Sequence, residues 1–333
     1  MLPANDSSLD AALARVRAYA SWIRYRDILA LQGAPLLGAV FALREVTAER
    51  LLELPVLGLA NLLLVAHIFV INDWAGVDAD LNDVNKRAGV FASRGLSRDG
   101  IRRLGIALLA SSLGLFGFLG PGPLALAAAI VILSALYSRP RSPLKGVPIL
   151  SSVLHIGGGM LHFLVGVSLF RAIDGPAIGF ALFCGLAFAA GHLNQEVRDL
   201  EGDRDNRITT NAVAFGKRRT FIAGLVLFTA AYAQLFALAA TGVIPGQLAI
   251  LGCLYPAHLY WSWKTMAEGL SFDSIRRFQA RYRALYAVIG AAVLSTLLVT
   301  ALRPIGTGRS LHRPDPSKAG LHWDRDSSRS DHN

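Results

Sequence analysis

Charged residues are scarce in this 333-residue chain, where they make up 17% of the sequence, against about a quarter in an average soluble domain. Cysteine is scarcer still: only Cys184 and Cys253 occur, both inside apolar runs. Two isolated cysteines exclude a disulfide framework or a thiolate metal site, and we expect both to be small buried hydrophobic residues. The first 27 residues lack the apolar core of a cleavable signal peptide, so we expect none.

Long apolar runs are what the sequence has in abundance. Hydrophobic residues make up 53% of the chain, and stretches of about 17 to 25 such residues match the ~30 Å hydrocarbon core of a bilayer. Eight such stretches occur, at 51–71, 104–120, 122–138, 147–170, 175–195, 220–241, 245–263 and 284–302, and the shorter run 28–43 is added as a ninth candidate. The sequence therefore predicts an all-α, polytopic membrane bundle of about nine transmembrane helices around a central cavity, and excludes a soluble enzyme.

The chain divides into three segments by composition. Residues 1–27 combine four arginines with a helical stripe of apolar residues, which predicts a cytoplasmic or interfacial amphipathic segment. Residues 28–302 form the predicted membrane domain. Residues 303–333 are rich in Pro, Ser, Asp, Arg and His, and we expect a disordered tail there.

The net charge of +10 would suggest a nucleic-acid partner in a soluble chain, but its distribution indicates another role. Most Lys and Arg residues lie in alternate loops, as the positive-inside rule requires if the N-terminus is cytoplasmic. We therefore expect no nucleic-acid partner, and a multi-pass protein of a bacterial cytoplasmic membrane whose basic loops meet membrane lipid.

Two acidic segments follow predicted helices and stand out as candidate sites. At about 100° per residue, three polar side chains of each segment fall on one helical face, whereas Asp78 of the first segment points away. The first face comprises Asn72, Asp73 and Asp80, and the second comprises Glu196, Asp199 and Asp203. Both segments lie on the cytoplasmic side of the predicted topology, so the two faces can meet.

Two facing stripes of oxygen ligands favour a hard cation, with Mg²⁺ the best match and Mn²⁺ an alternative. All six residues are predicted metal ligands, and Asp80, Asp199 and Asp203 are the predicted catalytic ones. Nearby cations suit a diphosphate. They are Lys86, Arg87, Arg204 and Arg207, together with Arg141 and Lys145 of the loop between the fourth and fifth predicted helices, where Tyr137 adds a hydroxyl that could also bind the diphosphate. Solvated loops that merely orient the chain would carry similar charges, and this alternative stays open.

Three histidines are candidates for an acceptor pocket. His155 and His162 are seven residues apart on one predicted helix, and the glycines at 157–159 between them would allow another helix to approach closely. His192 lies just before the second acidic segment. Each could orient an acceptor or take its proton, or could be a buried histidine that is hydrogen-bonded to a neighbouring helix.

Taken together, these motifs resemble the UbiA-type intramembrane prenyltransferase family over about residues 20–302. The sequence Asn72-Asp73-x-x-Gly76-x-x-x-Asp80 is similar to the first acidic motif of that family, and Glu196-x-x-Asp199-x-x-x-Asp203 to the second. The resemblance implies Mg²⁺-dependent transfer of a prenyl group from an isoprenoid diphosphate to a lipophilic or aromatic acceptor. The reaction would release pyrophosphate from a membrane-embedded site that opens to the cytoplasm.

The chain also departs from the family pattern. Gly76 replaces the middle aspartate of the first motif, Glu196 replaces an aspartate of the second, and the usual Asn-Arg-Pro is absent. A regular helix would keep Asp78 outside, whereas unwinding at Gly76 would bring Asp78 or Asp83 inward.

Two other functions are compatible with these features. The same fold could act as a terpene cyclase or lyase, in which the carbocation is quenched internally. A cation-coupled secondary transporter would also use carboxylates inside a helical bundle. The position of the carboxylates at helix ends favours the enzymes, because transporters place such groups near the bilayer midplane.

Overall fold

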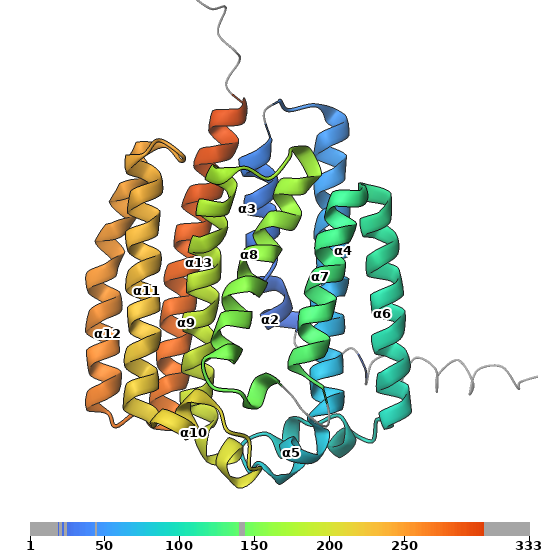
Figure 1. Ribbon diagram of the computed structural model, residues 1–333, viewed down its shortest axis with the longest axis vertical. Coiled ribbons are helices and arrows are strands. Elements are labelled where there is room, and N and C mark those ends of the chain that lie inside the picture. Colours follow the sequence, from blue (N-terminus) through green and yellow to red (C-terminus); the bar gives the residue numbers. More distant parts are fainter. Residues whose placement is uncertain (1–18, 20–21, 23–24, 44, 140–143, 303–333) are drawn as a thin grey trace, which may run out of the picture.

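The long apolar runs fold into α-helices that stand roughly side by side (Figure 1). The computed structural model describes residues 19, 22, 25–43, 45–139 and 144–302, and these residues contain helices, turns and loops but no strand. The predicted all-α class is therefore confirmed for this part of the chain.

Short helices and 3₁₀ turns connect the long helices. The elements are α2 (Tyr25–Ala30), α3 (Gly33–Ala42), α4 (Ala48–Ala75), α5 (Val77–Asn82), η1 (Arg87–Gly89), η2 (Ala92–Arg94), α6 (Arg98–Leu119), α7 (Pro121–Tyr137), η3 (Leu144–Gly146), α8 (Leu150–Phe170), α9 (Gly175–Asp205), α10 (Asn211–Phe215), α11 (Lys217–Ala240), η4 (Gly246–Leu254), α12 (Tyr255–Ala267) and α13 (Phe272–Leu302).

Local capping residues explain where several long helices begin. Thr47 and Ser97 accept hydrogen bonds from the backbone N–H groups of Arg50 and Gly100, at the starts of α4 and α6. Asp174 caps α9 in the same way. These side-chain oxygens satisfy N–H groups that have no partner within the helix, which is costly to leave unmet near a membrane.

Six helices of the described residues are long and apolar enough to cross a membrane, namely α4, α6, α8, α9, α11 and α13. Two further apolar helices, at 27–42 and in α7, are shorter. All nine predicted stretches are largely helical, with 28–43 divided between α2 and α3 and 245–263 between η4 and α12. A multi-pass helical membrane architecture follows, whereas the number of nine spans and the central cavity stay predictions.

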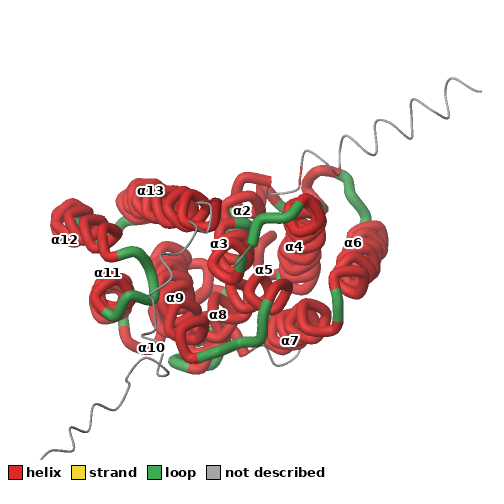
Figure 2. The backbone as a smooth tube through the Cα atoms, turned by 90° about the horizontal axis from the view of Figure 1, so that it is seen from above, coloured by secondary structure: helices red, strands yellow, loops and turns green. Residues whose placement is uncertain are grey.

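Glycines allow two of these helices to touch along their backbones. A Cβ atom at Gly38 of α3 would overlap the carbonyl oxygen of Phe163, and one at Gly166 of α8 would overlap the carbonyl oxygen of Pro35. Small residues of this kind permit close helix contact in membranes, where packing rather than hydrophobicity drives association. In Figure 2 α3 lies in the interior of the bundle with α8 and α9 beside it, while α6 and α12 lie at its periphery.

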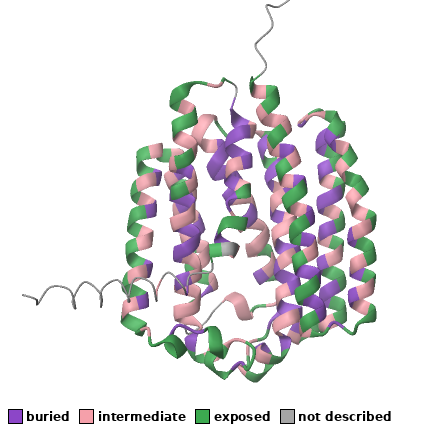
Figure 3. Cartoon of the chain, turned by 180° about the vertical axis from the view of Figure 1, so that it is seen from behind, coloured by how far each residue is buried: buried purple, intermediate pink, exposed green. Residues whose placement is uncertain are grey.

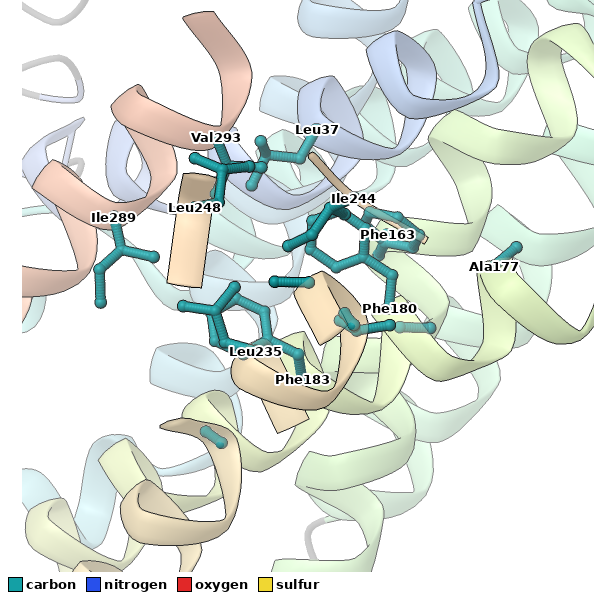
Figure 4. Packing of buried hydrophobic residues seen from close by; sticks show 14 of the residues in the cluster. Leu37, Phe163, Ala177, Phe180, Phe183, Leu235, Ile244, Leu248, Ile289 and Val293 are labelled. Atoms are coloured by element: carbon teal, nitrogen blue, oxygen red, sulfur yellow. The ribbon is translucent and has the colours of Figure 1, made fainter. Parts of the chain in front are cut away.

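The core is apolar and aromatic. Phe163, Phe180 and Leu235 pack together with residues of α13 such as Ile289 (Figure 4). The outer surfaces of the helices carry many exposed residues (Figure 3), and large apolar side chains are among them. Such a surface suits contact with lipid.

The expectation that both cysteines are buried is wrong for Cys253. Cys184 is partly buried in α9, but Cys253 is exposed on η4. The reason is physical: in a membrane bundle the lipid-facing positions are as apolar as the core, so hydrophobic surroundings in the sequence do not imply burial within the protein.

Candidate active site

The two acidic segments lie at the same end of the bundle, where α5 and α10 form its lower edge in Figure 1. Helix α4 ends at Ala75, and α5 resumes after the single residue Gly76. The N–H of Gly76 donates to the Asn72 carbonyl at 2.9 Å and that of Asp80 donates to the Gly76 carbonyl at 2.9 Å. The helical hydrogen bonds thus continue across the interruption.

This geometry distinguishes between the regular helix and the unwound helix that the sequence allows at Gly76. The side chain of Asp78 is 81% exposed and pairs with Arg98 at 3.5 Å, so it points away from the bundle. Asp83, which follows α5, has a buried side chain instead. The segment therefore turns Asp83 inward without unwinding at Gly76.

A lysine ammonium joins the two acidic segments. Lys86 Nζ lies 3.0 Å from Asp199 Oδ2 on α9, 3.8 Å from Asp80 Oδ1 on α5 and 3.7 Å from Asp83 Oδ2. Burial alone would lower the pKa of Lys86, but the negative charges of Asp199 and Asp80 outweigh it, so its pKa is raised above the usual 10.5. Lys86 is therefore charged at neutral pH.

Further cations contact Asp199 and Asp203 of the second segment. Arg198 donates from Nε and Nη2 to the two oxygens of Asp199 at 2.6 and 3.0 Å, and from Nη1 to Gln279 on α13 at 3.0 Å. Lys145, in the short turn η3, lies 3.6 Å from Asp203 Oδ1. Cationic side chains from three segments thus converge on these carboxylates, an arrangement suited to an anion such as a diphosphate.

Neutral hydrogen bonds also tie the two segments to each other and to α7. The side-chain amide of Asn206 donates to the Ala79 carbonyl at 2.9 Å, which connects the end of α9 with α5. Ser138, at the end of α7, donates to Asn72 Oδ1 at 3.1 Å. Residues 127 and 66 positions apart in the sequence are thereby held in one site.

Glu196 has a different environment from the aspartates. Its side chain is buried, and its oxygens accept hydrogen bonds from the backbone N–H of Asn211 at 3.0 Å, the Asn211 amide at 2.9 and 3.2 Å, and the Ser151 hydroxyl at 3.2 Å. His192 Nε2 lies 3.0 Å from Oε1, although it is poorly aligned for a hydrogen bond.

Two of the three predicted acceptor histidines lie together, and the third does not. The rings of His155 and His192 stack with centroids 3.5 Å apart and an angle of 5°, and Tyr137 meets His155 edge-on at 5.0 Å. His162 lies elsewhere in the interior and contacts the Asn61 amide oxygen at 3.1 Å. Its place is that of a buried histidine bonded to a neighbouring helix, the alternative raised by the sequence.

Several predicted diphosphate ligands are not gathered at the carboxylates. Arg87, Arg204 and Arg207 are exposed, and Arg204 pairs with Glu201 at 3.5 Å. Arg141 lies outside the described residues. The site also contains residues that sequence reasoning missed as site residues, namely Asp83, Ser151, Arg198 and Asn211. Asp83 and Arg198 adjoin the motifs and could have been found there, whereas no local signal pointed to Ser151 or Asn211.

The donor set suits a hard divalent cation only in part. Asp80, Asp83 and Asp199 all lie within 4 Å of one positive charge, the Lys86 ammonium, and all are oxygen donors. Over the described ranges, however, no group of three or more His, Cys, Asp or Glu side chains lies close enough to hold a metal ion by itself. A metal would therefore need further oxygen ligands from substrate or water.

Solved structures share this helical fold. A structure of digeranylgeranylglyceryl phosphate synthase is similar with a TM-score of 0.65 at 15% identity, over 86% of this chain and 99% of that one. A UbiA homolog from Archaeoglobus fulgidus, bound to GPP and Mg²⁺, is similar with a TM-score of 0.63 at 18% identity, over 82% and 99%. At these identities the likeness shows only that the chains share a fold.

The sequence itself supplies the family. The profile of the UbiA prenyltransferase family matches residues 34–287, which is most of the chain. The protein therefore belongs to the UbiA prenyltransferase family.

A curated relative matches over a shorter stretch. The lycopene elongase/hydratase of Haloferax volcanii is 29% identical over 177 residues, which cover 50% of this chain and 55% of that protein. The chain thus aligns with only about half the length of this relative.

Proposed function

We propose that this protein transfers a prenyl group from an isoprenoid diphosphate to a lipophilic acceptor within the membrane and releases pyrophosphate. The observation that carries the proposal is the meeting of both acidic segments around Lys86, at the end of an apolar bundle. This arrangement offers charges of both signs for a metal-bound diphosphate, at the end of apolar helices along which its hydrocarbon tail could lie.

The chain's own residues have separable tasks in this reaction. Lys86 and Lys145 would bind the diphosphate oxygens, while Asp80, Asp199 and Asp203 would hold Mg²⁺, with Asn72, Asp73 and Asp83 close to the same end. The metal supplies charge neutralisation for the leaving diphosphate. The bond from the allylic carbon to the diphosphate oxygen breaks, and its electron pair leaves with pyrophosphate.

The apolar bundle then protects the carbocation until the acceptor captures it. Exclusion of water prevents premature hydrolysis, and the aromatic face of Tyr137 is suited to stabilise positive charge. The acceptor forms the new bond with its own electron pair and loses a proton, for which the neighbouring His155 and His192 are candidates. Membership of the family favours this group transfer over internal cyclisation and over cation transport.

The test uses the full chain purified into lipid nanodiscs with Mg²⁺. Labelled geranyl, farnesyl and geranylgeranyl diphosphates are offered separately with a membrane lipid extract and, because of the curated relative, with lycopene. We expect a new prenylated lipid by mass spectrometry and stoichiometric release of pyrophosphate. Absence of product with every donor would contradict the proposal, and full turnover in excess EDTA would contradict its metal requirement.

A further inference from the structure

Glu196 occupies a position of the second motif at which the family pattern has an aspartate, and its surroundings differ from those of the other motif carboxylates. Its side chain is 4% exposed, and no Lys or Arg pairs with it at salt-bridge distance among the described contacts. Instead, Ser151 at the start of α8 and Asn211 in α10 donate hydrogen bonds to it, and His192 in the preceding turn of α9 lies 3.0 Å from its Oε1. Glu196 therefore joins three elements.

The hydrogen-bonding capacity of this carboxylate is already largely used. A carboxylate has about four lone-pair positions, and three donor groups approach Glu196: the backbone N–H of Asn211, the Asn211 side-chain amide, which lies within hydrogen-bonding distance of both oxygens, and the Ser151 hydroxyl. His192 Nε2 lies a further 3.0 Å away. A metal ion on Glu196 would have to compete with these donors, and a buried polar group that loses its partners costs about 1–3 kcal/mol.

The length of the side chain matters for this arrangement. Replacing glutamate by aspartate withdraws the carboxylate by one C–C bond of about 1.5 Å. Bonds of 2.9–3.2 Å to Asn211 and Ser151 would then exceed hydrogen-bonding distance. Asn211 is itself a link, because its Oδ1 accepts from the N–H of Ile149 at 2.7 Å, just before α8 begins.

We propose that Glu196 is a positioning residue and not a metal ligand: it joins α8, α9 and α10 and sets His192, and through ring stacking His155, beside Tyr137. The second acidic motif then divides into one structural carboxylate and two aspartates that face cations. The part of this inference that concerns acceptor binding rests on the proposed function, whereas the part that concerns the metal does not.

The experiment compares Glu196→Gln with Asp199→Asn in the full chain in nanodiscs. Glu201→Gln is the matched control, because Glu201 is on the same helix but its side chain is 64% exposed and pairs with Lys217. Three quantities are measured: Mn²⁺ affinity by electron paramagnetic resonance with inorganic pyrophosphate present, hydrogen exchange at 147–155 and 208–215, and the KM values of donor and acceptor.

We expect Glu196→Gln to leave Mn²⁺ affinity and donor KM within about twofold, to raise hydrogen exchange in both segments, and to raise acceptor KM about tenfold. Asp199→Asn should instead weaken Mn²⁺ binding at least about tenfold, and Glu201→Gln should change none of these quantities. Ser151→Ala removes one donor to Glu196 and should shift hydrogen exchange in the same direction, which keeps the test available if Glu196→Gln folds poorly.

Two results would overturn the inference. A loss of Mn²⁺ affinity in Glu196→Gln equal to that in Asp199→Asn would make Glu196 a metal ligand. Unchanged hydrogen exchange in both Glu196→Gln and Ser151→Ala would remove the positioning role. Failure of the proposed function has a separate signature, namely no prenyl product from the unmodified protein, and the metal and exchange measurements remain decisive in that case.

Discussion

At the scale of single residues, the charge balance of the site depends on Lys86. Its ammonium lies within 4 Å of Asp80, Asp83 and Asp199, which come from both acidic segments. Three carboxylates that face one another without this charge would repel each other and also repel an incoming diphosphate. The same ammonium can therefore hold the segments together and attract the donor.

Replacing this lysine tests its role directly. Lys86→Gln keeps a hydrogen-bonding side chain but removes the charge, so we expect the KM for the isoprenoid diphosphate to rise about tenfold, equivalent to about 1.4 kcal/mol. The measurement is a donor titration at fixed Mg²⁺. Lys217→Gln is the control, because Lys217 pairs with the exposed Glu201 at 3.2 Å. An unchanged donor KM in Lys86→Gln would mean that this ammonium does not meet the donor.

The aspartates of the first segment should differ sharply in importance. Asp80 faces Lys86, whereas Asp78 is exposed and pairs with Arg98. We expect Asp80→Asn, like Asp203→Asn on the second segment, to lower kcat/KM at least about 100-fold, or about 2.7 kcal/mol. Asp78→Asn should change it less than twofold. Steady-state kinetics of the three variants provide the measurement, and a severe loss in Asp78→Asn would show that the segment unwinds during turnover.

At the scale of elements, backbone contact between helices depends on glycine at some positions and not at others. The sequence drew attention to the glycines at 157–159, yet within that triplet only Gly159 packs tightly, against Gly185 of α9. A Cβ at Gly157 would meet nothing within 4 Å. The tighter contact between α3 and α8 uses Gly38 and Gly166, which stood out less in the sequence.

This difference predicts opposite effects of two alanine substitutions in the same helix. Gly166→Ala would place a methyl group against the Pro35 backbone, which cannot move aside easily, and we expect a loss of about 1–3 kcal/mol of stability. Gly157→Ala should be neutral or stabilise by up to about 1 kcal/mol through helix propensity. The thermal unfolding midpoint of the detergent-purified protein provides the measurement. Equal midpoints for both variants would contradict the close contact.

At the scale of the whole molecule, the site requires both acidic segments to lie on one side of the membrane. α6 and α11 begin at the end of the bundle that carries α5 and α10, whereas α7 begins at the opposite end (Figure 1). The basic loops predict that the end with the acidic segments is cytoplasmic.

Cysteine labelling tests this orientation. After replacement of Cys184 and Cys253, single cysteines at Asp99 and Arg218 should react with an impermeant reagent only from the cytoplasmic face. A cysteine at Gly122 should react only from the opposite face. Accessibility in right-side-out and inverted vesicles provides the measurement. If positions 99 and 218 react from different faces, one site cannot contain both motifs.

The sequence by itself determined the helical membrane class, the family and the segments that carry the acidic residues. Apolar runs and helical spacing are local properties, so they can be read without knowing which helices are neighbours. The orientation of Asp78 also followed from spacing along one helix. The exposure of Cys253 did not, because a lipid-facing surface and a core have the same composition.

Only the tertiary structure decided which charges meet. Lys86 and Asp199 are separated by more than a hundred residues along the chain, and so are Asn61 and His162, but helix packing brings each pair into contact. Helix packing also gives Glu196 partners that differ from those of Asp199 and Asp203, because its longer side chain reaches Asn211 and Ser151. Hydrogen bonds and ion pairs form over about 3–4 Å, and distances on that scale between remote segments exist only once the helices have packed.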